Sequence, residues 1–299
     1  MQLGHADRAA RTHLVLIPSY NTGARLSETV TKAHSYWRDV WVVIDGSGDG
    51  SGEALATRAG HRNGLRIIYR SVNGGKGAAI LDGLRLAAVD GFTHVLIMDA
   101  DGQHPASSIR EFIALSRENP HDLILGQPIF DDSAPRVRVI GRRLGNILAR
   151  LETGKDIGDS LFGFRVYPVA ELLNLMESGA RMRRFDFDTE ALVRLSWTDL
   201  HAIKRPVPVR YFRRNEGGVS HFRYGRDNFL LAAMHARLIG ESLRRRLSKN
   251  GSGRKQFFFE KKNQKTFTQK ADTTVAIDTS RKEQKFFGSF FQKRTAFFR

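Results

Sequence analysis

The sequence contains no cysteine among its 299 residues, and this absence excludes disulfide bonds, thiolate zinc sites, iron–sulfur clusters and thiol nucleophiles. It also contains no run of about 18 uncharged apolar residues, so we expect no transmembrane helix. The first residues lack the basic region, apolar core and cleavage site of a signal peptide, which predicts a cytoplasmic protein. Only eight residues are proline, whereas 41% are hydrophobic and 26% are charged. This composition is typical of a folded, enzyme-sized chain and not of a disordered or fibrous one.

Acidic residues are too few to balance the basic ones, since 31 Asp and Glu stand against 48 Lys and Arg and leave a net charge of +17. Such an excess predicts a polyanionic partner, namely nucleic acid, a layer of lipid headgroups or a phosphorylated substrate. The 49 residues from Gly251 to Arg299 hold 12 Lys and Arg against four Asp and Glu, together with ten of the 20 phenylalanines. This end of the chain therefore differs in kind from the first 250 residues.

Short apolar runs alternate with segments of helical period in the first half of the chain. We expect strands at 13–18, 40–45, 65–70, 93–99 and 122–126, with helices at 24–37, 50–59 and 77–88. Further helices are expected at 139–151 and 189–195, and extended segments at 163–167 and 201–209. The strands are almost continuously apolar, which indicates burial on both faces of a sheet. The pattern predicts a doubly wound, Rossmann-like α/β fold with a mostly parallel sheet and helices on both faces.

Residues 1–226 are predicted to form a catalytic domain, in which about 12–126 bind a donor and about 127–226 bind an acceptor. An amphipathic basic helix at 227–249 follows, and it could either lie on an anionic membrane surface or cap the domain. For the Phe- and Lys-rich tail at 250–299 we expect disorder, because no helical or strand period is sustained there. The same mixture of aromatic and basic residues could also bind single-stranded nucleic acid or a membrane interface.

Polar, glycine-rich turns follow each of the first four predicted strands, and ligands collect at the rim where the carboxyl ends of parallel strands meet. Asp99 and Asp101 end the fourth strand, so both carboxylates can face one point. Two such carboxylates would repel each other without a cation between them. Mg²⁺ or Mn²⁺ suits the pair, because such an ion takes one or two carboxylates and completes its shell with water and substrate phosphates. The pair therefore predicts a nucleotide diphosphate as ligand.

The glycine-rich turns do not match three other motifs. A dinucleotide G-x-G-x-x-G would need glycine where Ser51 stands, and a calcium loop would need glutamate where Ala56 stands. The turn before Lys76 lacks the spacing of a P-loop, although its bare amides and the lysine could still hold a phosphate. His104, directly before Pro105, is interpreted as a helix-entry residue.

Five blocks occur in an order that resembles one enzyme family. They are I-P-S-Y-N at 17–21, V-x-D-G-S-x-D-G-S at 43–51, N-x-G-K-G at 73–77, M-D-A-D-x-Q-H-P at 98–105 and D-x-x-x-G-F-R-x-Y at 159–167. From about Leu14 to Asp227 the chain resembles a family-2 glycosyltransferase of the GT-A fold, similar to polyprenyl- and dolichyl-phosphate mannosyl- or glucosyltransferases. Asp45 stands alone where the family usually pairs two acids, and Phe162 stands where its polyprenyl-phosphate members commonly carry serine.

The resemblance implies a site for a UDP- or GDP-sugar and its metal. Asp45 would contact the base, and Ser19 and Asn21 would line the nucleoside pocket. The residues assigned to the nucleotide sugar are Pro18, Ser19, Tyr20, Asn21, Asp45, Asn73, Lys76, Asp99, Ala100 and Asp101. Those assigned to Mg²⁺ or Mn²⁺ are Asp99, Asp101 and Gln103.

On the acceptor side, Asp188 and Glu190 resemble the family's acceptor-site acids, and Asp188 is the first choice as a catalytic base. The alternative is that these acids only cap the helix that follows. Arg214 and His221 lie in a cationic, glycine-containing loop, which resembles a late loop of the family and carries one extra residue. This loop would close over the diphosphate and stabilise the charge of the leaving group, or it would be a plain surface connection.

The predicted function is the inverting, metal-dependent transfer of a sugar from a nucleotide diphosphate to a lipid-linked or other membrane-proximal acceptor. The enzyme would be peripheral to the inner face of the plasma membrane. A sugar-1-phosphate nucleotidyltransferase would use a similar sheet but should carry a glycine- and arginine-rich loop where Ser19, Tyr20 and Asn21 stand. A nucleic-acid-binding protein would explain the basic tail but leaves Asp99 and Asp101 unexplained.

Overall fold

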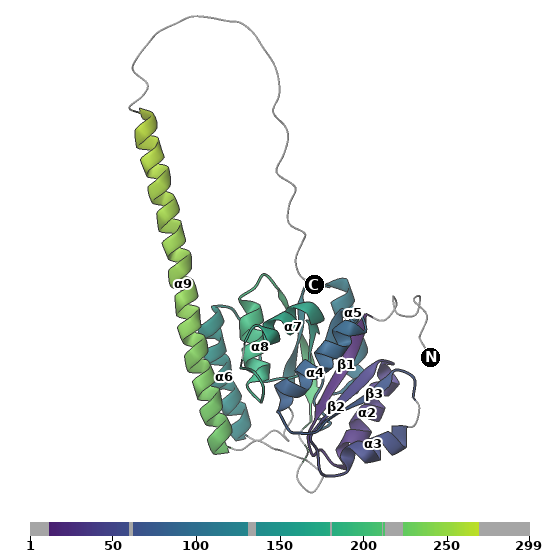
Figure 1. Cartoon of the computed structure of the whole chain (residues 1–299). Coiled ribbons are helices and arrows are strands. Elements are labelled where there is room, and N and C mark those ends of the chain that lie inside the picture. Colours follow the sequence, from purple (N-terminus) through teal and green to yellow (C-terminus); the bar gives the residue numbers. More distant parts are fainter. Residues whose placement is uncertain are drawn as a thin grey trace, which may run out of the picture. The chain divides into compact units, whose positions relative to one another are not determined.

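The computed structural model describes residues 12–59, 62–130, 136–179, 181–210, 212 and 224–268. The chain divides into two compact units, Met1–Arg246 and Leu247–Arg299. The first unit contains a seven-stranded sheet with helices on both faces (Figure 1). The predicted α/β fold is therefore confirmed. The first unit also takes in residues 227–246, which belong to the predicted basic helix.

The sheet is mostly parallel, as predicted. Its strands are β1 (His13–Ser19), β2 (Val40–Asp45), β3 (Leu65–Arg70), β4 (His94–Ile97), β5 (Leu123–Phe130), β6 (Arg165–Pro168) and β7 (Ala202–Val209), in the spatial order β3-β2-β1-β4-β6-β5-β7. β1 pairs in parallel with β2 and β4, and β5 pairs in parallel with β7, whereas β6 is antiparallel to both of its neighbours. Two antiparallel steps restore the strand direction, so the carboxyl end of β5 lies on the same rim as those of β1 to β4.

Eight α-helices and one short 3-10 helix lie within the described residues. They are α2 (Ala24–Tyr36), α3 (Ser51–Ala59), α4 (Lys76–Val89), η1 (Ala106–Ser108), α5 (Ile109–Glu118), α6 (Arg136–Thr153), α7 (Val169–Glu177), α8 (Phe187–Ser196) and α9 (Tyr224–Thr268). The predicted helices in the first 200 residues agree with this structure to within a few residues at each end, but α5 and α7 are not predicted from the sequence. Across the described ranges, no helix has the combination of length and apolar content that crossing a bilayer requires.

Successive residues of each central strand enter different cores on the two faces of the sheet. In β1, Leu14 and Leu16 belong to the cluster that contains side chains of α4, α7 and α8, whereas Val15 and Ile17 belong to the cluster that contains side chains of α2 and α5. All four are fully buried. Because side chains alternate between the faces of a strand, burying both faces demands apolar residues at every position. This is why the strands appear in the sequence as continuous apolar runs.

α9 is longer than the helix predicted at 227–249. Within the first unit, Met234 and Leu238 of α9 are 1% and 0% exposed and belong to the core cluster shared with α4 and α8. This part of α9 therefore packs on the domain through Met234 and Leu238, whereas Phe229 and Leu243 are 73% and 54% exposed. Residues 251–268 continue the helix, which corrects the expectation of disorder for this stretch. A helix that has already formed extends at the cost of ordering one residue per hydrogen bond, so a weak local pattern suffices. Residues 269–299 lie outside the described residues.

Candidate functional site

Three charged side chains from distant parts of the chain meet at the rim where the parallel strands end. Lys76 begins α4, Asp99 follows β4, and Asp188 lies in the first turn of α8. The Nζ atom of Lys76 is 2.6 Å from Oδ1 of Asp99, 2.7 Å from Oδ2 of Asp188 and 3.0 Å from Oδ1 of Asp188. One cation therefore bridges an acid of the predicted donor half and an acid of the predicted acceptor half.

Gly163 leaves the space in which these three side chains meet. A Cβ atom at this position would lie 2.7 Å from Nζ of Lys76 and 3.2 Å from both Oδ2 of Asp99 and Oδ1 of Asp188. Arg165, two residues later, is fully buried and donates hydrogen bonds to the backbone carbonyls of Asp188 and Asp159. Neither Gly163 nor Arg165 is among the predicted site residues, although the D-x-x-x-G-F-R-x-Y block contains both and could have identified them.

Burial and charge act in opposite directions on the pKa values of this cluster. Burial raises the pKa of Asp99, but the charge and hydrogen bond of Lys76, together with further positive charge nearby, outweigh burial and lower the value to about 2. Burial lowers the pKa of Lys76, whereas the carboxylates of Asp188 and Asp99 raise it above its usual value. Burial also raises the pKa of Asp188, with Lys76 acting in the opposite direction. The cluster thus combines a firmly ionised acid, a firmly charged lysine and a second acid with a raised pKa.

His104 is part of the site and also lies directly before Pro105, the N-cap of the η1 helix. Its side chain is buried, its Nδ1 atom accepts a 3.1 Å hydrogen bond from the backbone N–H of Asp99, and its Nε2 atom is 3.6 Å from Oδ2 of Asp99. Burial lowers the pKa of His104 to about 4, against the opposing effect of the Asp99 carboxylate. The interpretation as a helix-entry residue alone is therefore incomplete, because a neutral His104 fixes the backbone that carries Asp99.

Asp45 holds the turn that precedes Lys76. Its side chain is 1% exposed, and its two carboxylate oxygens accept hydrogen bonds from the backbone N–H groups of Gly74 at 2.9 Å and Gly75 at 2.7 Å. Arg70 forms an ion pair with the same carboxylate. Gly75 has a φ of +95°, and a Cβ atom there would lie 2.7 Å from the carbonyl oxygen of Arg183. Asp45 therefore fixes a tight glycine turn, and its predicted contact with a nucleotide base stays a prediction.

The turns after β1 and β2 are fastened to each other. Oδ1 of Asn21 accepts a 2.9 Å hydrogen bond from the N–H of Gly48, and the N–H of Asn21 donates a 3.0 Å hydrogen bond to Oγ of Ser47. Ser19 is buried and hydrogen-bonded to Thr22, whereas Tyr20 is 36% exposed. Pro18 lies buried in β1, and Asn73 lies in the turn after β3. The structure thus places the residues predicted for the nucleoside along one rim.

The loop after β4 carries the predicted metal ligands. Oδ1 of Asp101 accepts a 3.0 Å hydrogen bond from the N–H of Gln103, and the carbonyl of Ala100 accepts a 3.1 Å hydrogen bond from Thr29 of α2. Among the side chains that the structure describes, no three of Asp, Glu, His or Cys are grouped so that they could hold an ion. Two carboxylates with room for water and phosphate are nevertheless the donor set that Mg²⁺ takes in nucleotide sites. The residues fit such an ion, and its binding stays a prediction.

Glu190 faces away from the Lys76 cluster. Two residues along a helix differ by about 200° in direction, so Asp188 and Glu190 lie on opposite sides of α8. The Glu190 carboxylate is fully buried, 2.7 Å from Nε of Arg194, and it also pairs with Arg237 of α9. Arg194 in turn donates hydrogen bonds of 2.8 and 2.9 Å to Glu241 of α9. The structure therefore brings Asp188 to the other site residues and places Glu190 in an ion-pair network that joins α8 to α9.

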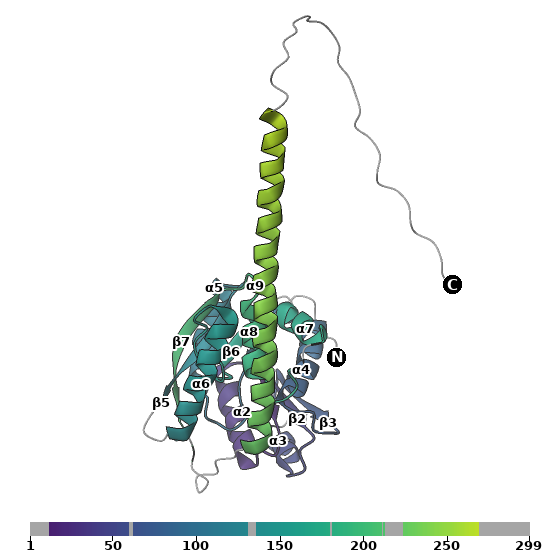
Figure 2. The same cartoon turned by 90° about the vertical axis from the view of Figure 1, so that its left-hand side faces the viewer.

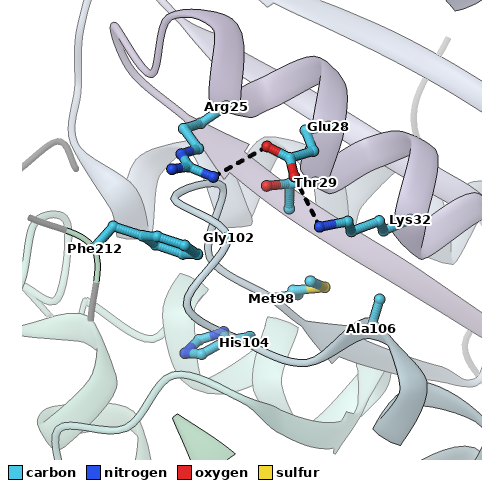
Figure 3. A pocket seen from close by; sticks show the side chains of 9 residues that line it. All are labelled: Arg25, Glu28, Thr29, Lys32, Met98, Gly102, His104, Ala106 and Phe212. Atoms are coloured by element: carbon cyan, nitrogen blue, oxygen red, sulfur yellow. Dashed lines mark hydrogen bonds and ion pairs between the residues drawn. The ribbon is translucent and has the colours of Figure 1, made fainter. Parts of the chain in front are cut away.

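Arg214 and His221 lie outside the described residues, so their predicted roles stay predictions. Phe212, the nearest described residue, packs against the loop that carries the predicted metal ligands. Its ring lies under the guanidinium of Arg25, with 3.9 Å between the ring centre and Cζ, and it lines a cavity together with Gly102 and His104 (Figure 3). The cavity measures about 20 Å³, room for about one water molecule. It is too small for a nucleotide sugar and lies between this loop, α2 and Phe212.

Comparison with known proteins shows which sequences this chain resembles. The model of the family described as "Glycosyl transferase family 2" matches residues 14–172. Undecaprenyl-phosphate mannosyltransferase of Micrococcus luteus is 25% identical over 215 residues, which cover 68% of this chain and 85% of that protein. Polyprenol monophosphomannose synthase of Mycolicibacterium smegmatis is 26% identical over 222 residues, which cover 71% of this chain and 82% of that protein.

A crystal structure of a mycobacterial protein shares the fold. It superposes with a TM-score of 0.54 at 19% sequence identity, over 80% of this chain and 75% of that chain. Together with the family match, this likeness confirms the resemblance drawn from the five sequence blocks and the GT-A type of the fold.

Proposed function

This chain belongs to glycosyl transferase family 2, and we propose that it moves a sugar from a UDP- or GDP-sugar to a polyprenyl phosphate or another lipid-linked acceptor, with inversion at the anomeric carbon. The observation that carries the proposal is the bridge that Lys76 forms between Asp99 and Asp188. It supports a single site in which a donor half and an acceptor half meet. The two relatives from Micrococcus luteus and Mycolicibacterium smegmatis, whose names specify polyprenyl substrates, support the class of acceptor.

On the donor side, Asp99 and Asp101, with Gln103, would hold Mg²⁺ or Mn²⁺. When bound, the ion would neutralise the donor diphosphate and make it a better leaving group. Asp45 supports the turn before Lys76 through two backbone hydrogen bonds, and this turn would border the nucleotide. The rim residues Ser19 and Asn21 would line the nucleoside, and the firmly charged Lys76 would face the diphosphate.

On the acceptor side, an oxygen of the acceptor attacks the anomeric carbon from the face opposite the diphosphate. The new bond joins this oxygen to the anomeric carbon, while the bond from the anomeric carbon to the diphosphate oxygen breaks and its electron pair leaves with the nucleoside diphosphate. A phosphate monoester is largely ionised near neutral pH, because its second pKa is about 6, and needs no base. Asp188 would then hold Lys76 in position, whereas with a hydroxyl acceptor it would take the proton.

The products test the proposal directly. The purified protein is incubated with a UDP- or GDP-sugar, a polyprenyl phosphate and Mn²⁺, and the released nucleotide and the anomeric configuration of the lipid-linked sugar are determined by NMR. We expect a nucleoside diphosphate and an inverted product. In a parallel assay, formation of a nucleotide sugar and inorganic pyrophosphate from UTP or GTP and a sugar 1-phosphate would instead support a sugar-1-phosphate nucleotidyltransferase. A retained configuration in the transfer assay would contradict the mechanism.

Variants of the two donor-side acids test the metal. Asp99→Asn and Asp101→Asn should each lower the transfer rate at least about 100-fold and abolish Mn²⁺-dependent donor binding, because each removes an anionic ligand. Asp156→Asn is the matched control, since Asp156 is half exposed and forms ion pairs with the surface cations Arg150 and Lys204. Unchanged turnover in either site variant would exclude this metal site.

We also propose that the enzyme is attached peripherally to an anionic membrane surface, as a lipid-linked acceptor requires. The net charge of +17 supports this proposal. Within the first unit, Met234 and Leu238 of α9 are buried against the domain, whereas Phe229 and Leu243 are exposed.

A further inference from the structure

Helix α6 exposes an apolar stripe to solvent. The stripe consists of Ile140, Leu144, Ile147 and Leu151, which are 65%, 61%, 55% and 61% exposed. Steps of four, three and four residues place these side chains within an arc of about 60° on the helix. Ala149, on the opposite side of α6, is fully buried. The helix therefore packs on the domain through its other side and presents the α6 stripe outwards.

Arginines border the α6 stripe. Arg143 and Arg150 are exposed on one flank of it, and Arg150 is 2.9 Å from the half-exposed Asp156. Arg246 of α9 donates a 2.8 Å hydrogen bond to the carbonyl of Leu151 at the end of the stripe. The acid within α6, Glu152, is buried and pairs with His235 of α9. An apolar face bordered by arginine is the pattern of a helix that lies in the interface of an anionic bilayer.

The α6 stripe begins beside the catalytic rim. α6 follows β5, whose carboxyl end lies on that rim, and the first part of α9 runs along the same side of the domain (Figures 1 and 2). Nη1 of Arg142 is 2.8 Å from Oδ1 of Asp159, and Oδ1 of Asn146 accepts hydrogen bonds from Ser160. These two residues of α6 therefore hold the segment that leads to Gly163. A bilayer that contacted α6 would lie next to the site in which a lipid-linked acceptor must react.

We propose that the α6 stripe inserts into the interfacial region of an anionic lipid bilayer, with the bordering arginines at the headgroup phosphates. A second copy of this chain fits the surface less well. A stable dimer interface uses about 20–30 residues on each side, far more than four side chains on one helix. A symmetric contact between two copies would also bring the same arginines towards one another. The purpose of the contact rests on the proposed lipid-linked acceptor, but the binding itself can be measured without any substrate.

Vesicle binding of the full-length chain tests the proposal. Partition coefficients are measured by co-sedimentation with vesicles of phosphatidylcholine alone and with 30% phosphatidylglycerol. We expect at least tenfold stronger binding to the anionic vesicles. Leu144→Glu and the double variant Leu144→Glu/Ile147→Glu should each bind these vesicles at least tenfold more weakly than the unchanged chain. Val89→Glu is the matched control, because Val89 at the end of α4 is 78% exposed and lies outside the α6 stripe. It should bind like the unchanged chain.

Depth of insertion supplies a second, independent measurement. A tryptophan introduced by Leu144→Trp should be quenched by brominated lipids in anionic vesicles, whereas one introduced by Val89→Trp should not be quenched. Wild-type binding by Leu144→Glu would overturn the proposal, because the basic tail present in every variant would then account for all of the affinity. A concentration-dependent dimer in light scattering that Leu144→Glu dissolves, with unchanged vesicle binding, would overturn it in favour of a second copy.

Activity in detergent separates this proposal from the proposed function. With a short-chain polyprenyl phosphate in detergent micelles, Leu144→Glu should transfer sugar at the unchanged rate, since no bilayer is involved. Asp99→Asn should lose transfer but keep its vesicle affinity. If Leu144→Glu transferred sugar more slowly in detergent, the substitution would have disturbed the folding of α6. That result would contradict the assignment of the stripe to lipid binding alone.

Discussion

Lys76 and Asp188 are 112 residues apart in the chain, yet Nζ of Lys76 lies 2.7 and 3.0 Å from the two carboxylate oxygens of Asp188. The same ammonium group contacts Asp99. Two acids of the site thus depend on one positive charge. Without it, the buried carboxylate of Asp188 would face the partly exposed carboxylate of Asp99 across the space that Gly163 leaves.

We expect Lys76→Met to lower the free energy of unfolding by about 3 kcal/mol, because removing one partner of a buried ion pair leaves the other charge uncompensated. Mn²⁺ should recover part of this loss, since it can supply the missing charge. Urea unfolding with and without Mn²⁺ measures both effects. Lys32→Met is the control, because its ion pair with Glu28 is exposed and should contribute less than about 1 kcal/mol. Equal losses in the two variants would contradict the assignment.

Conservative variants on α8 should separate catalysis from stability. Asp188→Asn should lower kcat by roughly 100-fold or more, whether Asp188 takes a proton or positions Lys76. Glu190→Gln should instead lower the free energy of unfolding by about 3 kcal/mol, because Arg194 and Arg237 lose a buried anionic partner. At a temperature where both variants are folded, Glu190→Gln should keep kcat within a few fold of the unchanged enzyme. A loss of kcat in Glu190→Gln with a loss of stability alone in Asp188→Asn would contradict these roles of the two acids.

Gly163→Ala should impair the reaction without unfolding the chain. The added Cβ atom would meet the flexible end of Lys76 at 2.7 Å, so the ammonium group must move away from its two carboxylates. We expect at least a tenfold loss of kcat together with weaker donor binding, because Lys76 would face the diphosphate. Gly145→Ala on α6 is the control, since its Cβ atom would make only ordinary contacts from 3.5 Å outwards. That variant should gain helix propensity and keep its activity.

The stability of the fold should decrease as the pH falls below about 6.5. Burial, assisted by His94 and Arg117, lowers the pKa of His13 to about 3, whereas an unfolded histidine titrates near 6.5. Between these values the unfolded chain binds a proton that the folded chain excludes, which costs about 2 kcal/mol at pH 5. Free energies of unfolding at pH 7 and pH 5 measure the difference. In His13→Gln the pH dependence should be shallower by about this amount, and an unchanged slope would exclude His13 as the cause.

Much of the fold and of the donor side of the site follows from the sequence. Continuous apolar runs mark strands that are covered on both faces, and the turns after them carry Asn21, Asp45, Lys76 and Asp99 to one rim. The direction of β6 cannot be obtained in this way. The four residues of β6 do not indicate by their sequence which strands they pair with. Their antiparallel pairing depends on the path that the chain takes through α6.

Two features could not be predicted from the sequence, because a helical period does not show what each face of the helix contacts. Asp188 and Glu190 are equally acidic in the sequence, and only packing shows that one meets Lys76 and the other meets Arg237. In the same way, α6 and α9 both appear amphipathic. Met234 and Leu238 of α9 are buried, whereas the stripe on α6 is exposed, and the sequence does not distinguish these cases.

Helix α8 forms ion pairs on two opposite sides. Asp188 in its first turn contacts Lys76, and Glu190, two residues later, contacts Arg237 of α9. A small rotation of α8 cannot shorten one of these ion pairs without lengthening the other. These contacts fix the orientation of α8 on both sides, and we expect a shift of α9 to change the angle at which Asp188 meets Lys76.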